Sequence, residues 1–404
     1  MIFRQLWGYK VMKNISQAVI LAGGRGVRLE PFTIGKPKPM YEFNQTPFLS
    51  YLLLQLKQWG ITDVLLLLGY MADVITGFYH DGSQFGMNIT YDITPVEFDT
   101  GARLRHAYDL LEASFLLMYC DNYCPLCFDR MDRQFMESGM LAQITAYGNK
   151  DAYTKGNLRI QDKIVQLYDK SRKAEGLQEV DIGYAFLKKE VITYISEENV
   201  NFEECVYPRL VGEGNLGVYV TEHRYYSVGS WARIQLTKDF FVPKKAVFID
   251  RDGTLNVRPP KAHYIEKPED FLWLDGAKEA VRLLHQAGYL LFLFTNQSGI
   301  ARGVMTQYQL DLIHLKMQSE LQKNGGCFDQ IYVCPHGWDE NCDCRKPKPG
   351  LLYQAQKDYS LNLLESIVIG DDDRDIEAGE AAGCRCYQVT EEKSLLEIVR
   401  EILE

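Results

Sequence analysis

The chain lacks any long hydrophobic run. No stretch of its 404 residues approaches the roughly 18 apolar residues of a membrane-spanning helix. Residues 1–12 also lack the apolar core and the small-residue cleavage site of a secretory signal, so we expect residues 1–14 to be an extension ahead of the first domain. The sequence therefore predicts a cytoplasmic protein that has no membrane partner.

Basic charge is scarce as well. The 44 Lys and Arg residues are outnumbered by 54 Asp and Glu residues, and no basic run offsets the net charge of −10. This balance argues against a nucleic-acid partner. Nucleotides and sugar phosphates remain compatible with it, because a few local cations and backbone N–H groups can hold them. Whether the chain forms a homo-oligomer is left open.

The ten cysteines do not look like a disulfide framework, because the chain is long and has no secretory signal. Cys334, His336, Cys342 and Cys344 instead have the residue types and tight spacing of a closed tetrahedral Zn²⁺ site. Such a site leaves no coordination position for water, so we expect a structural role. The pair at 384 and 386 has no nearby His and is expected to pack.

The chain also lacks internal repeats and low-complexity tracts, and instead shows two successive alternations of strands and helices. Its length favours two to three domains. We expect a domain over residues 15–240, a linker at 241–245 and a second domain over 246–404. The alternation predicts two three-layer α/β/α Rossmann-like domains. The first is expected to have a mixed sheet, and the second a zinc loop without a large cap.

In the second half, polar groups follow the predicted strands in a regular order. Asp250 and Asp252 come after an apolar run, Thr295 ends the next strand, Lys346 follows the zinc loop, and Asp371 follows a later strand. Ligands collect at the carboxyl ends of strands in open α/β sheets. A single Asp-Gly pair usually caps a turn, but four such groups in this order indicate a phosphate site.

These four motifs resemble those of the haloacid dehalogenase superfamily of phosphotransferases. The resemblance implies that Asp250 attacks the phosphoryl group and becomes an aspartyl phosphate. It implies that Asp252 protonates the leaving oxygen and then activates water. Thr295 would bind a phosphoryl oxygen, and Lys346 would balance the clustered negative charge.

The same resemblance implies a Mg²⁺ ion held by the Asp250 carboxylate, the Asp252 carbonyl and Asp371, with Asp375 in support. The zinc loop and the motif beginning at Thr295 narrow it to the heptose bisphosphate 7-phosphatases, with the histidinol-phosphate phosphatases as near relatives. Asp372 departs from the heptose enzymes, which often have Lys there. The expected substrate-binding residues are Asn296, Gln297, Ser298, Arg302 and Arg345, the two arginines gripping the distal phosphate.

The first half has a glycine loop after its first strand, at residues 21–29. Its glycines let a phosphate approach the backbone closely. The spacing fits neither the dinucleotide fingerprint nor the Walker loop. Together with a Pro-Lys-Pro motif at residues 37–39 and Asp121 at a later strand end, it resembles the sugar-1-phosphate nucleotidylyltransferases.

By this resemblance Arg28 neutralises the triphosphate, Lys38 the reacting phosphates, and Asp121 holds Mg²⁺. Lys170 would contact the sugar phosphate, and Gly101 is another expected substrate-binding position. Transfers of this kind depend on positioning and charge neutralisation. The expected nucleotide-binding residues, besides Arg28 and Lys38, are Leu21, Ala22, Gly23, Gly24 and Gly26.

Two residues of the first half depart from the nucleotidylyltransferase pattern. Val27 replaces the usual Thr of the glycine loop, and Ser227 stands where relatives carry a metal-binding Asp. The second change removes a carboxylate from the expected Mg²⁺ site. Weak or absent transferase activity is therefore an alternative hypothesis for this half.

The two halves complement each other, because a 7-phosphatase yields a sugar 1-phosphate and a nucleotidylyltransferase consumes one. The sequence predicts a bifunctional enzyme that makes a nucleotide-activated heptose, with GTP as the favoured nucleotide and GDP-D-glycero-α-D-manno-heptose as the product. One alternative is a phosphatase regulated by a degenerate transferase-like domain. Another is a histidinol-phosphate phosphatase fused to a sugar nucleotidylyltransferase.

Overall fold

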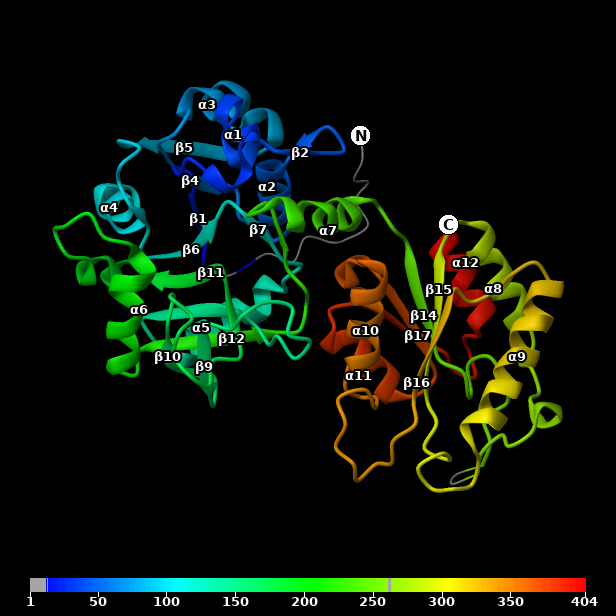
Figure 1. Ribbon diagram of the computed structural model, residues 1–404. Coiled ribbons are helices and arrows are strands. Elements are labelled where there is room, and N and C mark those ends of the chain that lie inside the picture. The colour runs from blue at the N-terminus through cyan, green and yellow to red at the C-terminus, as the bar shows by residue number, and fades with distance from the viewer. Residues whose placement is uncertain (1–11, 13, 261–262) are drawn as a thin grey trace. The chain divides into compact units, whose positions relative to one another are not determined.

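The computed structural model describes residue 12, residues 14–260 and residues 263–404. The chain forms two compact units and passes from one to the other between Phe241 and Val242 (Figure 1). The two α/β domains expected from the alternation are therefore confirmed. Most of the predicted extension at residues 1–14 lies outside the described residues. Within the described part of the chain, no helix combines the length and the hydropathy needed to cross a membrane.

Unit 1 is built on a nine-stranded mixed sheet with the strand order β5-β4-β1-β6-β11-β8-β12-β10-β9. Strand β1 pairs in parallel with β4 and β6, whereas β11 runs antiparallel to β6 and β8. The strands are β1 (Gln17–Leu21), β4 (Asp63–Leu68), β5 (Asn88–Ile93), β6 (Ser114–Tyr119), β8 (Ala142–Tyr147), β9 (Leu158–Gln161), β10 (Ile164–Tyr168), β11 (Val180–Lys188) and β12 (Leu216–Thr221).

Both faces of this sheet are covered. Alternate residues of β1 join different core clusters, with Ala18 and Ile20 on one face and Val19 and Leu21 on the other. The first cluster contains residues of α2 (Phe48–Gln58), α3 (Ala72–Tyr79), α5 (Phe128–Ser138) and α7 (Trp231–Phe241), and the second contains residues of α4 (Thr100–His106) and α6 (Phe202–Gly212). The predicted three-layer arrangement of the first domain follows from this alternation.

Short elements shape the rim of unit 1. Strand β7 (Asn122–Tyr123) pairs antiparallel with β13 (Tyr226–Ser227), which sets Ser227 opposite Asn122. This pairing brings a late segment of the unit beside the end of β6. Unit 1 also contains the short helix α1 (Phe32–Gly35) and the hairpin of β2 (Glu42–Phe43) and β3 (Thr46–Pro47).

Unit 2 has a five-stranded parallel sheet with the order β16-β15-β14-β17-β18. Its strands are β14 (Ala246–Ile249), β15 (Leu290–Asn296), β16 (Gln330–Cys334), β17 (Ile367–Gly370) and β18 (Arg385–Gln388). Strand β14 is central, so residues that follow it lie between the ends of its neighbours. This places Asp250 in the middle of the carboxyl edge.

The sheet of unit 2 is also covered on both faces. Val247 and Ile249 join one core cluster, and Ala246 and Phe248 join the other. The helices are α8 (Ala277–Gln286), α9 (Gln307–Lys323), α10 (Gly350–Tyr359), α11 (Asp373–Ala381) and α12 (Leu395–Leu403). Helix α9 begins directly after Thr306, which forms a capping box with Gln309.

Candidate active sites

The carboxyl edge of the unit 2 sheet holds a buried ion-pair cluster. Lys346 Nζ lies 2.6 Å from Asp250 Oδ1, 2.6 Å from Asp375 Oδ1 and 3.0 Å from the carbonyl oxygen of Phe294. The Lys346 residue is only 4% exposed. Although burial opposes its charge, the two carboxylates more than offset that effect and raise the pKa of Lys346.

For Asp250, burial outweighs the attraction of the neighbouring cation. Burial raises the pKa of Asp250 to about 7, and the repulsion of Asp375 adds to the effect, while Lys346 acts against it. Asp250 therefore depends on a neighbouring cation for the ionised form that a nucleophile needs. The predicted closeness of Asp250 and Lys346 is what the structure shows.

Three carboxylates form a group that could hold a cation. Oxygens of Asp250, Asp371 and Asp375 all lie within 4.8 Å of one another. Two of these residues are the predicted carboxylate ligands for Mg²⁺, and hard oxygen ligands suit that ion. Arg258 Nη2 stands 2.8 Å from Asp371 Oδ2, and Arg258 Nε is 3.4 Å from the Asp252 carbonyl oxygen, so a cation already lies against two predicted ligands.

The Asp252 side chain does not join this group. It accepts hydrogen bonds from Arg251 Nε at 3.0 Å, from Asn256 at 3.0 Å and from Gln297 at 2.8 Å. Burial alone would raise its pKa, but the charge of Arg251 and these donors hold the pKa of Asp252 below its usual value. The geometry fits the expectation that only the Asp252 carbonyl faces the cation, which leaves the carboxylate for proton transfer.

The other predicted residues of this half lie around the cluster. Asn296 exchanges two hydrogen bonds with the backbone of Lys346, at 3.2 and 3.1 Å, and thereby positions it. Gln297 also donates to Thr295 Oγ1 at 2.8 Å. Ser298 Oγ lies 3.2 Å from Tyr264 Oη.

The two arginines predicted to bind the distal phosphate lie beside the cysteine loop. The Arg345 guanidinium donates to the His336 carbonyl oxygen at 3.2 Å, and the guanidinium carbon of Arg302 lies 5.7 Å from the ring centre of Trp338. Asp372, the departure noted in the sequence, accepts from Arg374 at 2.8 Å and from Arg258 at 3.1 Å. Two guanidinium groups thus neutralise the added carboxylate.

Cys334, His336, Cys342 and Cys344 converge between β16 and α10. Their ligand atoms lie within 4.8 Å of one another, with individual separations of 3.2 to 3.7 Å. Ligands placed about 2.3 Å from a central ion would stand about 3.8 Å apart. The group can therefore hold a metal ion, and three thiolates with one imidazole are the donors of structural zinc sites.

We expect Cys342→Ser to lower the zinc content of the purified protein from about one equivalent to about zero, because three donors bind this ion much more weakly than four. Elemental analysis measures the content. Cys327→Ser, a cysteine outside the group, serves as the control. Equal zinc content in the two variants would contradict the assignment.

In unit 1, the glycine loop lies at the carboxyl end of β1, where Leu21 and Ala22 are buried. The absence of a side chain at Gly23 makes room for Arg103, because a Cβ there would stand 2.4 Å from the guanidinium carbon. The buried Arg103 donates to the carbonyl oxygens of Leu68, at 2.6 Å, and Pro95, at 3.0 Å. It therefore links the carboxyl ends of three strands, β1, β4 and β5.

The other glycines of the first half differ in their surroundings. Gly24 has open space where a side chain would lie, which is compatible with the predicted approach of a phosphate. Gly26 adopts φ 65°, a left-handed conformation that favours glycine. Gly101 is packed against the Val200 carbonyl oxygen, which accepts from its N–H at 3.0 Å, and it is not among the residues that line the cavity described next.

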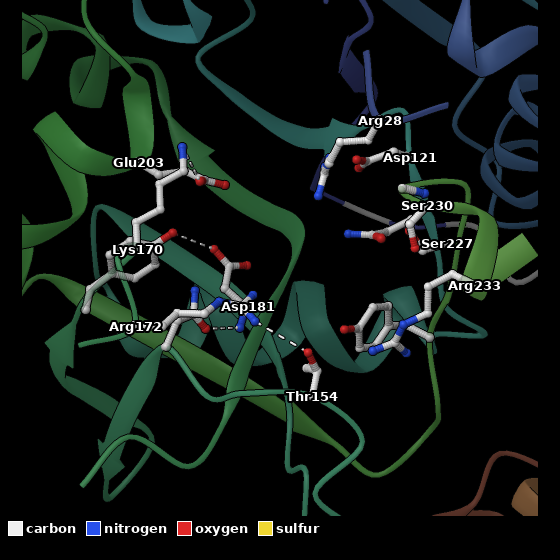
Figure 2. A pocket seen from close by; sticks show the side chains of 15 residues that line it. Arg28, Asp121, Thr154, Lys170, Arg172, Asp181, Glu203, Ser227, Ser230 and Arg233 are labelled. Carbon is white, nitrogen blue, oxygen red and sulfur yellow. Dashed lines mark hydrogen bonds and ion pairs between the residues drawn. The ribbon is translucent and has the colours of Figure 1, made fainter. Parts of the chain in front are cut away.

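A cavity of about 420 Å³ opens in unit 1. Figure 2 shows its side chains in two groups, with Arg28, Asp121, Ser227, Ser230 and Arg233 facing Lys170, Arg172, Asp181 and Glu203 across the space. The first group contains two guanidinium groups and one carboxylate, whereas the second contains two cations, Lys170 and Arg172, and two carboxylates. The cavity is thus more positive at one end than at the other.

Lys38 and Asp121 form an ion pair at the positive end, with Nζ and Oδ2 2.8 Å apart. Burial acts to raise the pKa of Asp121, but Lys38 and Arg28 hold it below its usual value. Ser227 Oγ accepts from the Gly229 N–H at 2.8 Å. Asp121 is the one carboxylate that lines this end of the cavity, so the described residues form no ready cation cradle, and the Mg²⁺ site at Asp121 stays a prediction.

The opposite end of the cavity contains two carboxylates, Asp181 and Glu203, that the sequence analysis missed. Lys170 Nζ, which was predicted, lies 2.6 Å from Asn201 Oδ1 and 3.1 Å from Glu203 Oε2. Asp181 accepts from the Tyr168 hydroxyl at 3.3 Å and from the Gly183 N–H at 3.0 Å. Glu203 lies in the first turn of α6, and no local motif marked either acid.

Asp181 gives a test of pH dependence. Burial first, and then repulsion by Glu203, raise the pKa of Asp181 to about 7. The folded state therefore keeps a proton that the unfolded state loses near pH 4, and stability falls as the pH rises from about 4 to 7. We expect Asp181→Asn to remove this loss, so that the variant is about 2–4 kcal/mol more stable than wild type at pH 8 and about equal at pH 4.

Urea denaturation at both pH values measures the difference. Asp162→Asn, an exposed position in the turn between β9 and β10, is the matched control. A gain for Asp181→Asn that is the same at pH 4 and pH 8 would contradict the assignment.

Comparison with known proteins bears on each half. The nucleotidyl transferase family model matches residues 17–241, and the HAD-hydrolase-like model matches residues 343–401. The D-glycero-beta-D-manno-heptose-1,7-bisphosphate 7-phosphatase of Haemophilus ducreyi is 42% identical over 149 residues, which cover 35% of this chain and 80% of that protein.

Two solved structures are similar to unit 1. A Bacillus anthracis structure, assigned as a glucose-1-phosphate thymidylyltransferase, has a TM-score of 0.51 and 21% identity, and covers 56% of this chain and 97% of its own. HddC from Yersinia pseudotuberculosis has a TM-score of 0.49 and 26% identity, with coverage of 56% and 100%. The chain belongs to the nucleotidyl transferase family through its first unit and to the heptose-bisphosphate 7-phosphatase family of HAD-like hydrolases through its second.

Proposed function

We propose that unit 2 removes the 7-phosphate of D-glycero-D-manno-heptose 1,7-bisphosphate. An oxygen of Asp250 attacks the phosphorus, the bond from phosphorus to the sugar oxygen breaks, and an aspartyl phosphate forms. Lys346, 2.6 Å from Asp250, keeps this carboxylate ionised and neutralises the added phosphate charge. A Mg²⁺ ion at Asp250 and Asp371 would shield that charge further.

Asp252 carries the protons in this proposal. The arriving phosphate favours its protonated form through charge repulsion. Its carboxyl group then gives the proton to the leaving sugar oxygen. In the second step the carboxylate takes a proton from water, which attacks the aspartyl phosphate and releases inorganic phosphate. Arg251 and Gln297 fix the direction of this carboxylate.

Unit 1 then transfers a guanylyl group from GTP to heptose 1-phosphate. An oxygen of the sugar phosphate attacks the α-phosphorus, and pyrophosphate leaves. Arg28 and Lys38 supply positive charge for the nucleotide phosphates. The carboxylates of Asp181 and Glu203 can accept hydrogen bonds from sugar hydroxyls, which supports placing the sugar at their end of the cavity.

The observation that carries this proposal is the presence of both units in one chain. The product of the heptose-bisphosphate phosphatases is a heptose 1-phosphate, and the family of unit 1 acts on substrates of that class. A cluster of three thiol groups and a histidine further supports a reducing compartment, so we place the protein in the cytoplasm.

The two activities are tested separately on the purified chain with Mg²⁺. We expect inorganic phosphate from heptose bisphosphate alone, and pyrophosphate from heptose 1-phosphate with GTP. A panel of nucleoside triphosphates and both anomers of each sugar define the specificity. Absence of both products would refute the proposal.

Ser227 favours a second candidate, in which unit 1 is a sugar-nucleotide sensor without transferase activity. The Lys38→Ala variant separates the two readings. We expect it to abolish pyrophosphate release that the wild-type chain shows, whereas a sensor shows none in either form. A side-by-side phosphatase assay with histidinol phosphate tests the remaining alternative, and a preference for that substrate would overturn the assignment to heptose.

A further inference from the structure

The positive end of the unit 1 cavity has more cations than its carboxylate can balance. Arg28 and Arg233 both line it, and Lys38 already pairs with Asp121, the carboxylate of that group. Figure 2 shows Arg28 and Arg233 on the same side of the cavity as Ser227. An unbalanced cluster of this kind attracts a polyanion.

Arg233 is held in place by aromatic residues. It lies in the first turn of α7, its guanidinium carbon is 3.8 Å from the ring centre of Tyr153 and 5.7 Å from that of Tyr225, and its Nη2 donates to the Tyr153 carbonyl oxygen at 3.1 Å. Its Nη1 is buried and has no hydrogen-bond partner among the described residues. A buried donor without an acceptor calls for a ligand or a water molecule.

The excess of positive charge at this end is linked to Ser227. The residue stands where the resemblance places a metal-binding carboxylate, and a hydroxyl group brings no negative charge. A metal ion would therefore find Asp121 alone at this end, paired with Lys38 at 2.8 Å. Guanidinium groups, in contrast, carry a permanent charge and match phosphate oxygens in a planar fork.

We propose that Arg233, together with Arg28, binds the phosphate groups of the nucleoside triphosphate. The two guanidinium groups supply the positive charge that a metal ion held by a second carboxylate would otherwise provide. The inference rests on the proposed transferase function of unit 1 and adds a phosphate-binding residue to it. It makes binding of the phosphates at this end independent of a divalent cation.

Calorimetric titration of the full chain with pyrophosphate, with EDTA present, tests the proposal. We expect wild type to bind and Arg233→Met to bind about 10- to 100-fold more weakly, the range of a charge-assisted hydrogen bond or two. Arg172→Met, at the opposite end of the cavity, is the control and is expected to stay within about twofold of wild type. No metal-free binding by wild type, or equal affinities of wild type and Arg233→Met, would overturn the proposal.

Two further variants protect the test against misfolding. Arg233→Lys keeps the charge but loses the planar fork, so we expect it to bind more weakly than wild type and more tightly than Arg233→Met, and a loss as large as that of Met would contradict a role based on charge. Ser227→Asp adds negative charge and is expected to weaken metal-free binding, and unchanged or stronger binding would count against the proposal. Phosphatase activity of unit 2 checks that each preparation contains intact chain, and binding retained by Arg233→Lys checks that unit 1 tolerates a change at this position.

The binding assay separates this inference from the proposed function. Arg233-dependent binding of pyrophosphate without any turnover of GTP and heptose 1-phosphate would refute the transferase and leave the phosphate site standing. Turnover with no effect of Arg233→Met on pyrophosphate affinity would do the reverse.

Discussion

Replacing Asp250 by Asn is expected to abolish release of phosphate from heptose bisphosphate, by about 10⁴-fold or more. The amide has nearly the shape of the carboxylate but cannot attack phosphorus, and it cannot form the 2.6 Å ion pair with Lys346. A phosphate-release assay measures the loss. The same preparation should release pyrophosphate from GTP and heptose 1-phosphate at the wild-type rate, because unit 1 contains its own cavity.

That second activity is the internal control for the amount of intact chain, and the unfolding transition of unit 2 checks that the variant is folded. A variant that keeps more than about one per cent of wild-type phosphatase activity would rule out Asp250 as the nucleophile. Trapping of a phosphorylated wild-type chain, absent from Asp250→Asn, gives an independent reading of the same step.

Replacing Lys346 by Met is expected to lower the free energy of unfolding of unit 2 by about 3–5 kcal/mol. The ammonium group lies 2.6 Å from both Asp250 and Asp375, and its removal leaves two buried carboxylates close together without a cation. The penalty should shrink at low pH, where the carboxylates take up protons. Denaturant unfolding of the full chain measures it.

Lys348→Met is the matched control. Lys348 is half-buried at the surface, and its Nζ donates to Asn341 Oδ1 at 2.7 Å, so we expect a change of less than about 0.5 kcal/mol. Equal stability of the two variants would show that Lys346 does not neutralise the acidic cluster.

Much of the unit 2 site could be predicted from the sequence, because parallel strands bring their carboxyl ends to one edge. That rule, together with the resemblance to the haloacid dehalogenase motifs, placed Asp250 near Lys346, although they lie 96 residues apart in the chain. The rule does not give the direction of a side chain. The turn of the Asp252 carboxylate toward Arg251, and the approach of Arg258 to Asp371, depend on packing that no local motif encodes.

Less of the unit 1 site could be predicted. The glycine loop was correctly placed after the first strand. However, the missing side chain of Gly23 leaves room for Arg103 of α4, and the spacing within the loop cannot reveal this contact. Asp181 and Glu203 come from a strand and a helix whose sequences carry no phosphate or sugar signature. Both line the cavity, and Glu203 lies close enough to raise the pKa of Asp181, a contact between a strand and a helix that no local pattern reveals.

The order of the two reactions is the central claim, and one time course tests it most directly. The purified chain receives heptose 1,7-bisphosphate, GTP and Mg²⁺, and phosphate and pyrophosphate are followed together. We predict that phosphate appears first, that pyrophosphate follows after a lag, and that Asp250→Asn releases neither from this substrate. Pyrophosphate that forms from the bisphosphate at the same rate in Asp250→Asn as in wild type would contradict the account.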